Sequence, residues 1–161
     1  MRAITQFIIA FAALLSIVSG TASAQVVALG ASNTAGKGVG MAQAFPAQLQ
    51  SMLKGTRVTN AGISGNTTGD MLARLNSAVP AGTKVVIVQY GGNDGRKGVA
   101  GSRQANIDKI ESTLSARGIK IVQADGLVRS ALQSGLKLSD NQHLTIEGHR
   151  QVASGLVSSM P

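Results

Sequence analysis

The chain has 161 residues, and its 15 Lys and Arg against 7 Asp and Glu give a formal net charge of +8 at pH 7. It contains no cysteine, which excludes disulfides, a cysteine nucleophile and thiolate metal ligands. Aromatic residues make up only 2% and the basic residues are scattered along the chain, so we expect no nucleic-acid partner and at most peripheral contact with an anionic membrane surface.

The first 24 residues have the features of a secretory signal peptide. Arg2 supplies a positive start, residues 7–18 form an apolar core, and Ala22-Ser23-Ala24 is a small-x-small cleavage site. The apolar core is shorter than the roughly 20 residues that a membrane-spanning helix needs. The sequence therefore predicts cleavage after Ala24 and one domain, residues 25–161, in the bacterial periplasm or outside the cell. An uncleaved membrane anchor is the alternative.

Short apolar runs alternate with amphipathic patterns along the rest of the chain. The predicted strands are residues 25–29, 57–63, 84–90 and 119–124, and the predicted helices are residues 45–53, 70–78, 105–116 and 146–160. The third strand is apolar on both faces, as a central strand of a parallel sheet should be. This alternation predicts an α/β domain with a parallel sheet of four to five strands covered by helices on both faces, a three-layer αβα sandwich.

The first strand runs into a glycine-rich stretch, GASNTAGKG, at residues 30–38. A phosphate-binding P-loop would need glycine at position 31 and a hydroxyl at position 38, where this chain has Ala31 and Gly38. A serine in the turn after a buried strand instead projects its hydroxyl at the carboxyl edge of the sheet, where α/β proteins place their sites. Ser32 is therefore a candidate nucleophile.

The ends of the second and third strands supply candidate hydrogen-bond donors. The second strand leads to Gly65, whose N–H has no side chain to obstruct it, and the third leads to Asn93, whose amide can donate. Acyl transfer from a serine forms a tetrahedral oxyanion that such donors stabilise. Together with the N–H of Ser32, these two residues are the candidate oxyanion hole.

A histidine and three acids are candidates for the base and the group that orients it. Asp140 and His143 are three residues apart before the last helix, so a turn would let the carboxylate reach one ring nitrogen. Asp94 and Asp125 are alternative acids. Asp140 could instead cap a helix and His143 could be a surface residue. His149 lies within the last helical pattern, where we expect it to pack or to face solvent.

The stretches GASNTAG, NAGISG, GGND and DNQH, in this order, resemble the four sequence blocks of the SGNH (GDSL) hydrolase family, and most closely its small periplasmic thioesterase, lysophospholipase and arylesterase members. The resemblance implies a flavodoxin-like fold and hydrolysis of carboxylic esters or thioesters through an acyl-enzyme on Ser32. It also implies His143 as the base, Asp140 as its orienting acid, and an oxyanion hole of Ser32, Gly65 and Asn93. The family needs no metal or cofactor.

The chain departs from the family pattern in two places. Ala31 stands where the family has an aspartate before the nucleophile, and we expect the side chain of Asn33 to bond back to the turn backbone in its place. Residues 125–139 leave no room for the extra helix and fifth strand common in the family, so we expect an open substrate groove.

The sequence leaves two other functions open. The chain could remove acetyl groups from wall polysaccharide, although it has few aromatic residues to stack on sugars. It could also be a non-catalytic binding module on the same fold. The expected substrate is a small-molecule or lipid ester, and the sequence leaves the acyl length, the leaving group and the oligomeric state open.

Overall fold

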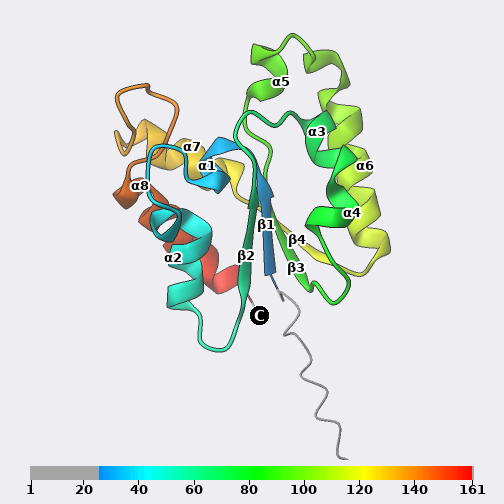
Figure 1. Ribbon diagram of the computed structural model, residues 1–161, viewed down its shortest axis with the longest axis horizontal. Helices are drawn as coiled ribbons and strands as arrows, with labels where there is room; N and C mark the ends of the chain where they lie inside the picture. Colours follow the sequence, from blue (N-terminus) through cyan, green and yellow to red (C-terminus); the bar gives the residue numbers. More distant parts are fainter. Residues whose placement is uncertain (1–25, 161) are drawn as a thin grey trace, which may run out of the picture.

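The computed structural model describes residues 26–160, in which a four-stranded parallel sheet lies between two layers of helices (Figure 1). The strands are β1 (Val26–Gly30), β2 (Val58–Gly62), β3 (Val85–Gln89) and β4 (Lys120–Gln123), in the order β2-β1-β3-β4. The predicted three-layer α/β fold is confirmed, with four strands in the described part of the chain. The predicted signal peptide, residues 1–24, lies outside the described residues.

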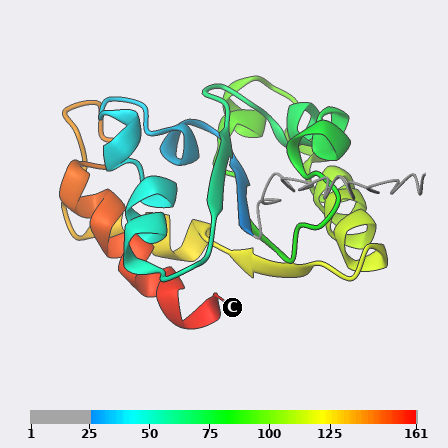
Figure 2. The same cartoon turned by 60° about the horizontal axis from the view of Figure 1, so that its bottom comes forward.

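Helices cover both faces of the sheet (Figure 2). One face packs against α3 (Thr68–Ala73), α4 (Leu75–Ala78) and α6 (Arg103–Ala116), and the other against α2 (Phe45–Met52), α7 (Asp125–Gln133) and α8 (Ile146–Leu156). Two single-turn helices, α1 (Ser32–Ala35) and α5 (Asn93–Arg96), follow the carboxyl ends of β1 and β3. Short 3-10 turns span Met41–Gln43, Ala100–Ser102 and Val157–Ser159. No helix among residues 26–160 is long and apolar enough to cross a membrane.

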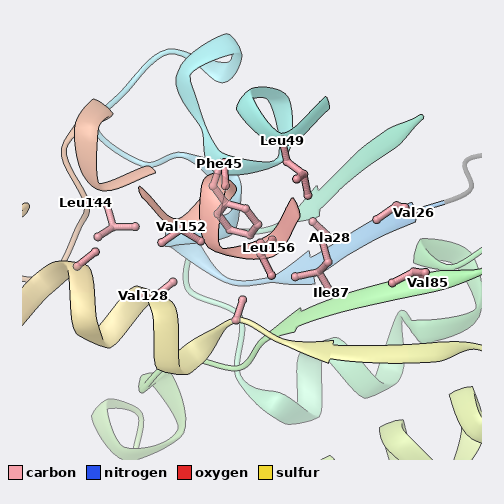
Figure 3. Packing of buried hydrophobic residues seen from close by; sticks show 13 residues of the cluster. Val26, Ala28, Phe45, Leu49, Val85, Ile87, Val128, Leu144, Val152 and Leu156 are labelled. Carbon is pink, nitrogen blue, oxygen red and sulfur yellow. The ribbon is translucent and has the colours of Figure 1, made fainter. Parts of the chain in front are cut away.

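The central strands β1 and β3 are apolar on both faces because both faces are covered. Side chains of β1 alternate between the two cores, with Val27 and Leu29 on one side and Val26 and Ala28 on the other. We call the core beneath α3, α4 and α6 the first core and the core beneath α2, α7 and α8 the second core. Figure 3 shows the second core, in which side chains from α2 and α8 pack over Ala28 and Ile87. Burying each such valine, leucine or isoleucine contributes about 1.5–3 kcal/mol, so these strands anchor the sheet edge that carries the site.

The helix predicted at residues 70–78 is instead two helices, α3 and α4, separated at Arg74. The helix also begins earlier than predicted, because Thr67 and Asp70 form a capping box at its N-terminus. The guanidinium of Arg74 donates to Asn66 Oδ1 at 2.6 Å and to the carbonyl of Gly30 at 3.1 Å. Arg74 therefore ties α3 and α4 to the ends of β1 and β2.

The expectation that residues 125–139 leave no room for a further helix is wrong. They contain the nine-residue helix α7, which begins at Asp125 and buries Val128 and Ala131 against the second core. Beyond it, Lys137 and Leu144 form an isolated antiparallel bridge that adds no strand to the sheet. The segment therefore covers the sheet and also forms one wall of the site.

Candidate active site

The chain order places the candidate site where the connections of the sheet change direction. From β1 the chain crosses to β2 on one side and then returns to β3 on the other side of β1. In open parallel sheets such a reversal leaves a crevice at the carboxyl ends of the two strands, and ligands bind there. The helices α1 and α5 follow β1 and β3 (Figure 1). Ser32 and Asn93 are their first residues, so both residues flank this crevice.

The turn that presents Ser32 depends on close packing between α1 and β2. A Cβ on Gly62 would lie 2.3 Å from the backbone nitrogen of Ala35, so only glycine lets α1 approach the strand this closely. Ser32 is the first residue of α1 and is only 9% exposed. The first N–H groups of a helix have no acceptor within it, which leaves the N–H of Ser32 suited to an anion.

The structure brings Ser32, His143 and Asp140 together although the serine is 111 residues from the histidine. Ser32 Oγ lies 2.9 Å from His143 Nε2, and His143 Nδ1 lies 2.5 Å from Asp140 Oδ2. Because a carboxylate only accepts, Nδ1 carries a proton and Nε2 is free to accept from the serine. The hydrogen bond from His143, followed by the backbone N–H groups of Gln142 and His143, lowers the pKa of Asp140 below its usual range, so its carboxylate is ionised at neutral pH.

The two alternative acids, Asp94 and Asp125, bind other groups and do not contact His143. The carboxylate of Asp94 accepts from the N–H and hydroxyl of Thr68 and pairs with Arg103 at 3.2 Å. The carboxylate of Asp125 accepts from the backbone N–H groups of Tyr90 and Gly91 at 2.9 and 3.0 Å. Of the three candidates, Asp140 is therefore the acid that contacts the histidine.

His149 has a structural role in the second core. Its ring is fully buried, stacks on Phe45 with 6.4 Å between ring centres, and accepts the Phe45 N–H at Nδ1. Burial, and to a smaller extent the charge of His143, lowers the pKa of His149 to about 4. Its Nε2 has no hydrogen-bond partner among residues 26–160. His149 therefore packs as a neutral ring, as one of the two sequence-based alternatives predicted.

Asn93 and Gly65 lie in different surroundings. Asn93 is 8% exposed, and its amide is held at both ends, since Nδ2 donates to the carbonyl of Asn66 at 2.8 Å and Oδ1 accepts from Arg96 at 2.8 Å. An amide nitrogen has two hydrogens, so the second can serve a ligand. Gly65 has φ +84, a left-handed conformation that glycine adopts without strain. Ser32 and Asn93 share a pocket of about 330 Å³, whereas Gly65 does not line it.

Asn33 holds the loop that carries His143, a role that the sequence did not reveal. Its Nδ2 donates to the carbonyl of Gln142 at 3.1 Å, and its Oδ1 accepts the N–H of Leu144 at 3.0 Å. These are the two neighbours of His143 in the chain. The expectation that Asn33 bonds back to its own turn in place of the missing aspartate is therefore wrong, because its amide is used by the loop opposite. Ala31 itself is 2% exposed and packs in the first core.

A serine, a histidine and a carboxylate joined in this order at the switch point of a parallel sheet have the geometry that serine hydrolases use for acyl transfer. Residues 28–154 match the GDSL-like Lipase/Acylhydrolase family, and the chain belongs to this family. The predicted family is thus confirmed.

Esterase TesA from Pseudomonas aeruginosa is 34% identical over 119 residues, which cover 68% of this chain and 58% of TesA. The chain therefore matches little more than half the length of this curated relative. A crystal structure of TesA superposes with a TM-score of 0.74 at 22% identity, covering 83% of this chain and 96% of that structure. The psychrotrophic esterase EstA from Pseudoalteromonas sp. superposes with a TM-score of 0.72 at 17% identity, covering 85% and 96%. At these identities the two structures show a common fold.

Proposed function

We propose that this protein is a serine hydrolase that cleaves carboxylic esters or thioesters through an acyl-enzyme on Ser32. The observation that carries the proposal is the 2.9 Å contact between Ser32 Oγ and His143 Nε2, with Asp140 bonded to the other ring nitrogen. Membership of the GDSL-like lipase/acylhydrolase family supports an ester substrate. The proposed substrate is a small-molecule or lipid ester.

In the proposed mechanism, Ser32 Oγ attacks the carbonyl carbon of the ester while its proton passes to His143 Nε2. Asp140 keeps Nδ1 protonated and stabilises the imidazolium that forms. The tetrahedral intermediate then collapses, the bond to the leaving oxygen or sulfur breaks, and the leaving group takes the proton from Nε2. Water, deprotonated by the same histidine, then attacks the acyl-serine. The bond between the acyl carbon and Ser32 Oγ breaks, Oγ takes the proton back from Nε2, and the carboxylic acid leaves.

The proposed oxyanion hole consists of the N–H of Ser32, the N–H of Gly65 and the second hydrogen on Asn93 Nδ2. Asn93 is supported by its fixed orientation, because the hydrogen bonds to Asn66 and Arg96 hold both ends of its amide. A donor that is already oriented needs no reorganisation when charge develops on the carbonyl oxygen. Replacing Asn93 with alanine should therefore lower kcat by roughly 10²- to 10³-fold.

The test uses the full chain as expressed and p-nitrophenyl acetate as the substrate. Ser32→Ala and His143→Ala should each lower kcat by roughly 10³- to 10⁶-fold, and the double variant should be little worse, because the two residues act as a unit. Ser77→Ala, which alters an exposed serine on α4, is the matched control and should keep the wild-type rate. A Ser32→Ala protein with near wild-type kcat would refute the acyl-enzyme, and a wild-type protein without turnover would favour the binding-module alternative.

We also propose that the chain is exported to the periplasm or medium and cleaved after Ala24. The proposal rests on the sequence pattern of residues 1–24, outside the described part of the structure. Protein recovered from the periplasm or the medium of a bacterial host should begin at Gln25 by mass spectrometry. Recovery of the chain with residues 1–24 intact from the membrane fraction would support the uncleaved anchor instead.

A further inference from the structure

The pocket next to Ser32 carries an excess of positive charge. Its volume is about 330 Å³, and three arginines line it, namely Arg96, Arg103 and Arg129. Asp125 is the one carboxylate among its lining residues. Because Ser32 and Asn93 line the same pocket, a substrate with its carbonyl at Ser32 would extend part of its structure along these arginines.

Two of the three guanidinium groups have no carboxylate partner among residues 26–160. Arg103 pairs with Asp94 at 3.2 Å, but Arg96 donates to the neutral amide of Asn93 and Arg129 is exposed on α7 without an acidic partner in the described part of the chain. The carboxylate of Asp125 keeps its charge, but it accepts from the N–H groups of Tyr90 and Gly91 and from the side chain of Gln89 and forms no ion pair with a guanidinium of the described residues. One carboxylate against two unpaired guanidinium groups leaves the pocket with a net positive charge. The pocket therefore presents unpaired positive charge to a ligand.

The same pocket also has an apolar wall. Val128 and Leu132, one turn apart on α7, line it together with Arg129. An acyl chain or other short apolar segment can pack against these two side chains, while a charged end reaches the guanidinium groups at the rim. Guanidinium groups bind carboxylate and phosphate oxygens through paired N–H donors, which favours these anions over neutral polar groups.

From these observations we propose that the preferred substrates are esters with a carboxylate or phosphate group, separated from the scissile carbonyl by a short apolar segment and bound by Arg96 and Arg129. This inference rests on the proposed function, because it takes Ser32 as the reacting group. The proposed preference for anionic esters depends on the excess charge of this pocket. It therefore differs from non-specific attraction of anions to the net charge of the whole chain.

Two matched pairs of substrates test the proposal and show which side of the ester carries the anion. Mono-4-nitrophenyl adipate and its neutral methyl ester differ only in a carboxylate at the end of the acyl chain. 4-Acetoxybenzoate and methyl 4-acetoxybenzoate differ in the same way on the leaving group. In at least one pair the anionic member should have about tenfold higher kcat/KM, mainly through a lower KM, and the preference should shrink as salt screens the charges.

Arginine variants locate the preference in this pocket. Arg129→Gln should reduce the ratio of kcat/KM between anionic and neutral esters severalfold. Arg150→Gln removes the same charge from an exposed position on α8, where Arg150 pairs with Glu147, and should leave the ratio unchanged. A ratio that survives Arg129→Gln unchanged, or that falls equally with Arg150→Gln, would overturn the assignment to this pocket.

The outcomes separate this inference from the proposed function. If Ser32→Ala abolishes turnover of both neutral esters and neither pair shows a preference for the anion, the serine mechanism stands and the anionic substrate class is refuted. If Ser32→Ala leaves turnover unchanged, the proposed function fails and the inference fails with it. A preference in the adipate pair places the anion on the acyl side, and one in the acetoxybenzoate pair places it on the leaving group.

Discussion

At the scale of single residues, Asn33 positions His143 without touching a reacting atom. One amide contacts the chain on both sides of the histidine, through the carbonyl of Gln142 and the N–H of Leu144. These bonds connect the turn that carries the proposed nucleophile, Ser32, directly to the loop that carries the proposed base, His143. We therefore expect the distance between Ser32 Oγ and His143 Nε2 to depend on Asn33, although the residue lies outside the proposed proton-transfer path.

Replacing Asn33 with alanine should lower kcat about 10- to 100-fold while KM stays within about twofold, because a misplacement of about 1 Å in reacting groups can cost roughly 10² in rate. Asn33→Asp keeps an acceptor for the Leu144 N–H but cannot donate to Gln142, so it should recover part of the loss. Asn76→Ala, at an exposed position on α4, is the control for asparagine removal. Steady-state kinetics at a temperature where all three variants are folded is the measurement, and an unchanged kcat in Asn33→Ala would contradict the positioning role.

The residues of the proposed triad could be predicted from sequence, whereas the contacts of Asn33 could not. Ser32, Asp140 and His143 stand in short motifs whose spacing has chemical meaning, and each motif follows a predicted strand or precedes a predicted helix. Asn33 bonds to residues 109 and 111 positions away, and no local pattern encodes such a pair. The family resemblance implied Asp140 as the orienting acid, and the contact of its carboxylate with His143 distinguishes it from Asp94 and Asp125, which are also acids next to predicted elements.

His149 should make the stability of the fold depend on pH. Its folded-state pKa is about 4, mainly because of burial, against an ordinary value of 6.5. Between these values the unfolded chain binds a proton that the folded protein does not, so this contribution to stability is complete above pH 6.5 and is lost as the pH falls toward 4. From pH 7 to pH 4 the loss should be about 2–3 kcal/mol.

The matched variant is His149→Gln, which keeps an acceptor for the Phe45 N–H but does not titrate. Urea denaturation at pH 7, 5.5 and 4 should show a steeper fall in the free energy of unfolding for the wild type than for His149→Gln. A loss of packing in His149→Gln lowers the free energy of unfolding equally at every pH. It therefore does not affect the comparison of how steeply that free energy falls with pH. Parallel pH profiles would show that another group carries the dependence.

At the scale of elements, Asp94 joins three segments beside the site. Its carboxylate accepts from the N–H and hydroxyl of Thr68 at the start of α3 and pairs with Arg103 at the start of α6. The side chain is 1% exposed, so these contacts are shielded from water. Because Asn93 precedes Asp94 in α5, the same contacts fix the element that carries a proposed oxyanion donor.

Asp94→Ala should lower the free energy of unfolding by about 3 kcal/mol, because it leaves a guanidinium and a helix N-terminus without their buried acceptor. Asp108→Ala, at an exposed position on α6, is the matched control and should stay within about 0.5 kcal/mol of the wild type. Guanidinium denaturation followed by circular dichroism measures both. Equal midpoints for the two variants would contradict the role assigned to Asp94.

Element prediction succeeded where an apolar pattern stood out, both in the fully buried strands β1 and β3 and in the partly exposed strands β2 and β4. The four strands were predicted because each is a short run rich in apolar residues, and α6 because its apolar residues recur along one face. The helices α1 and α5 are single turns of four residues, too short for periodicity to reveal. The break at Arg74 was not predicted, since arginine is a good helix former and its bonds to Asn66 and Gly30 arise only from the tertiary fold.

At the scale of the whole molecule, the site results from the order in which the strands join the sheet. Since β1 and β3 are neighbours and their connections leave in opposite directions, the loops after them open a crevice at one edge. The alternation of strands and helices predicted the parallel sheet, but the order β2-β1-β3-β4 emerged only from the structure. That order brings Ser32, Asn93 and the arginine-lined pocket to the same edge.

The central claim is that Ser32 becomes acylated during turnover, and covalent labelling tests it most directly. The full chain is incubated with a fluorophosphonate, which reacts with an activated serine hydroxyl, and the adduct is located by peptide mass spectrometry. We predict one adduct per chain, on Ser32, with none on Ser32→Ala and much slower labelling of His143→Ala. An adduct on a different residue, or an unlabelled Ser32 in a protein that still hydrolyses esters, would contradict the account.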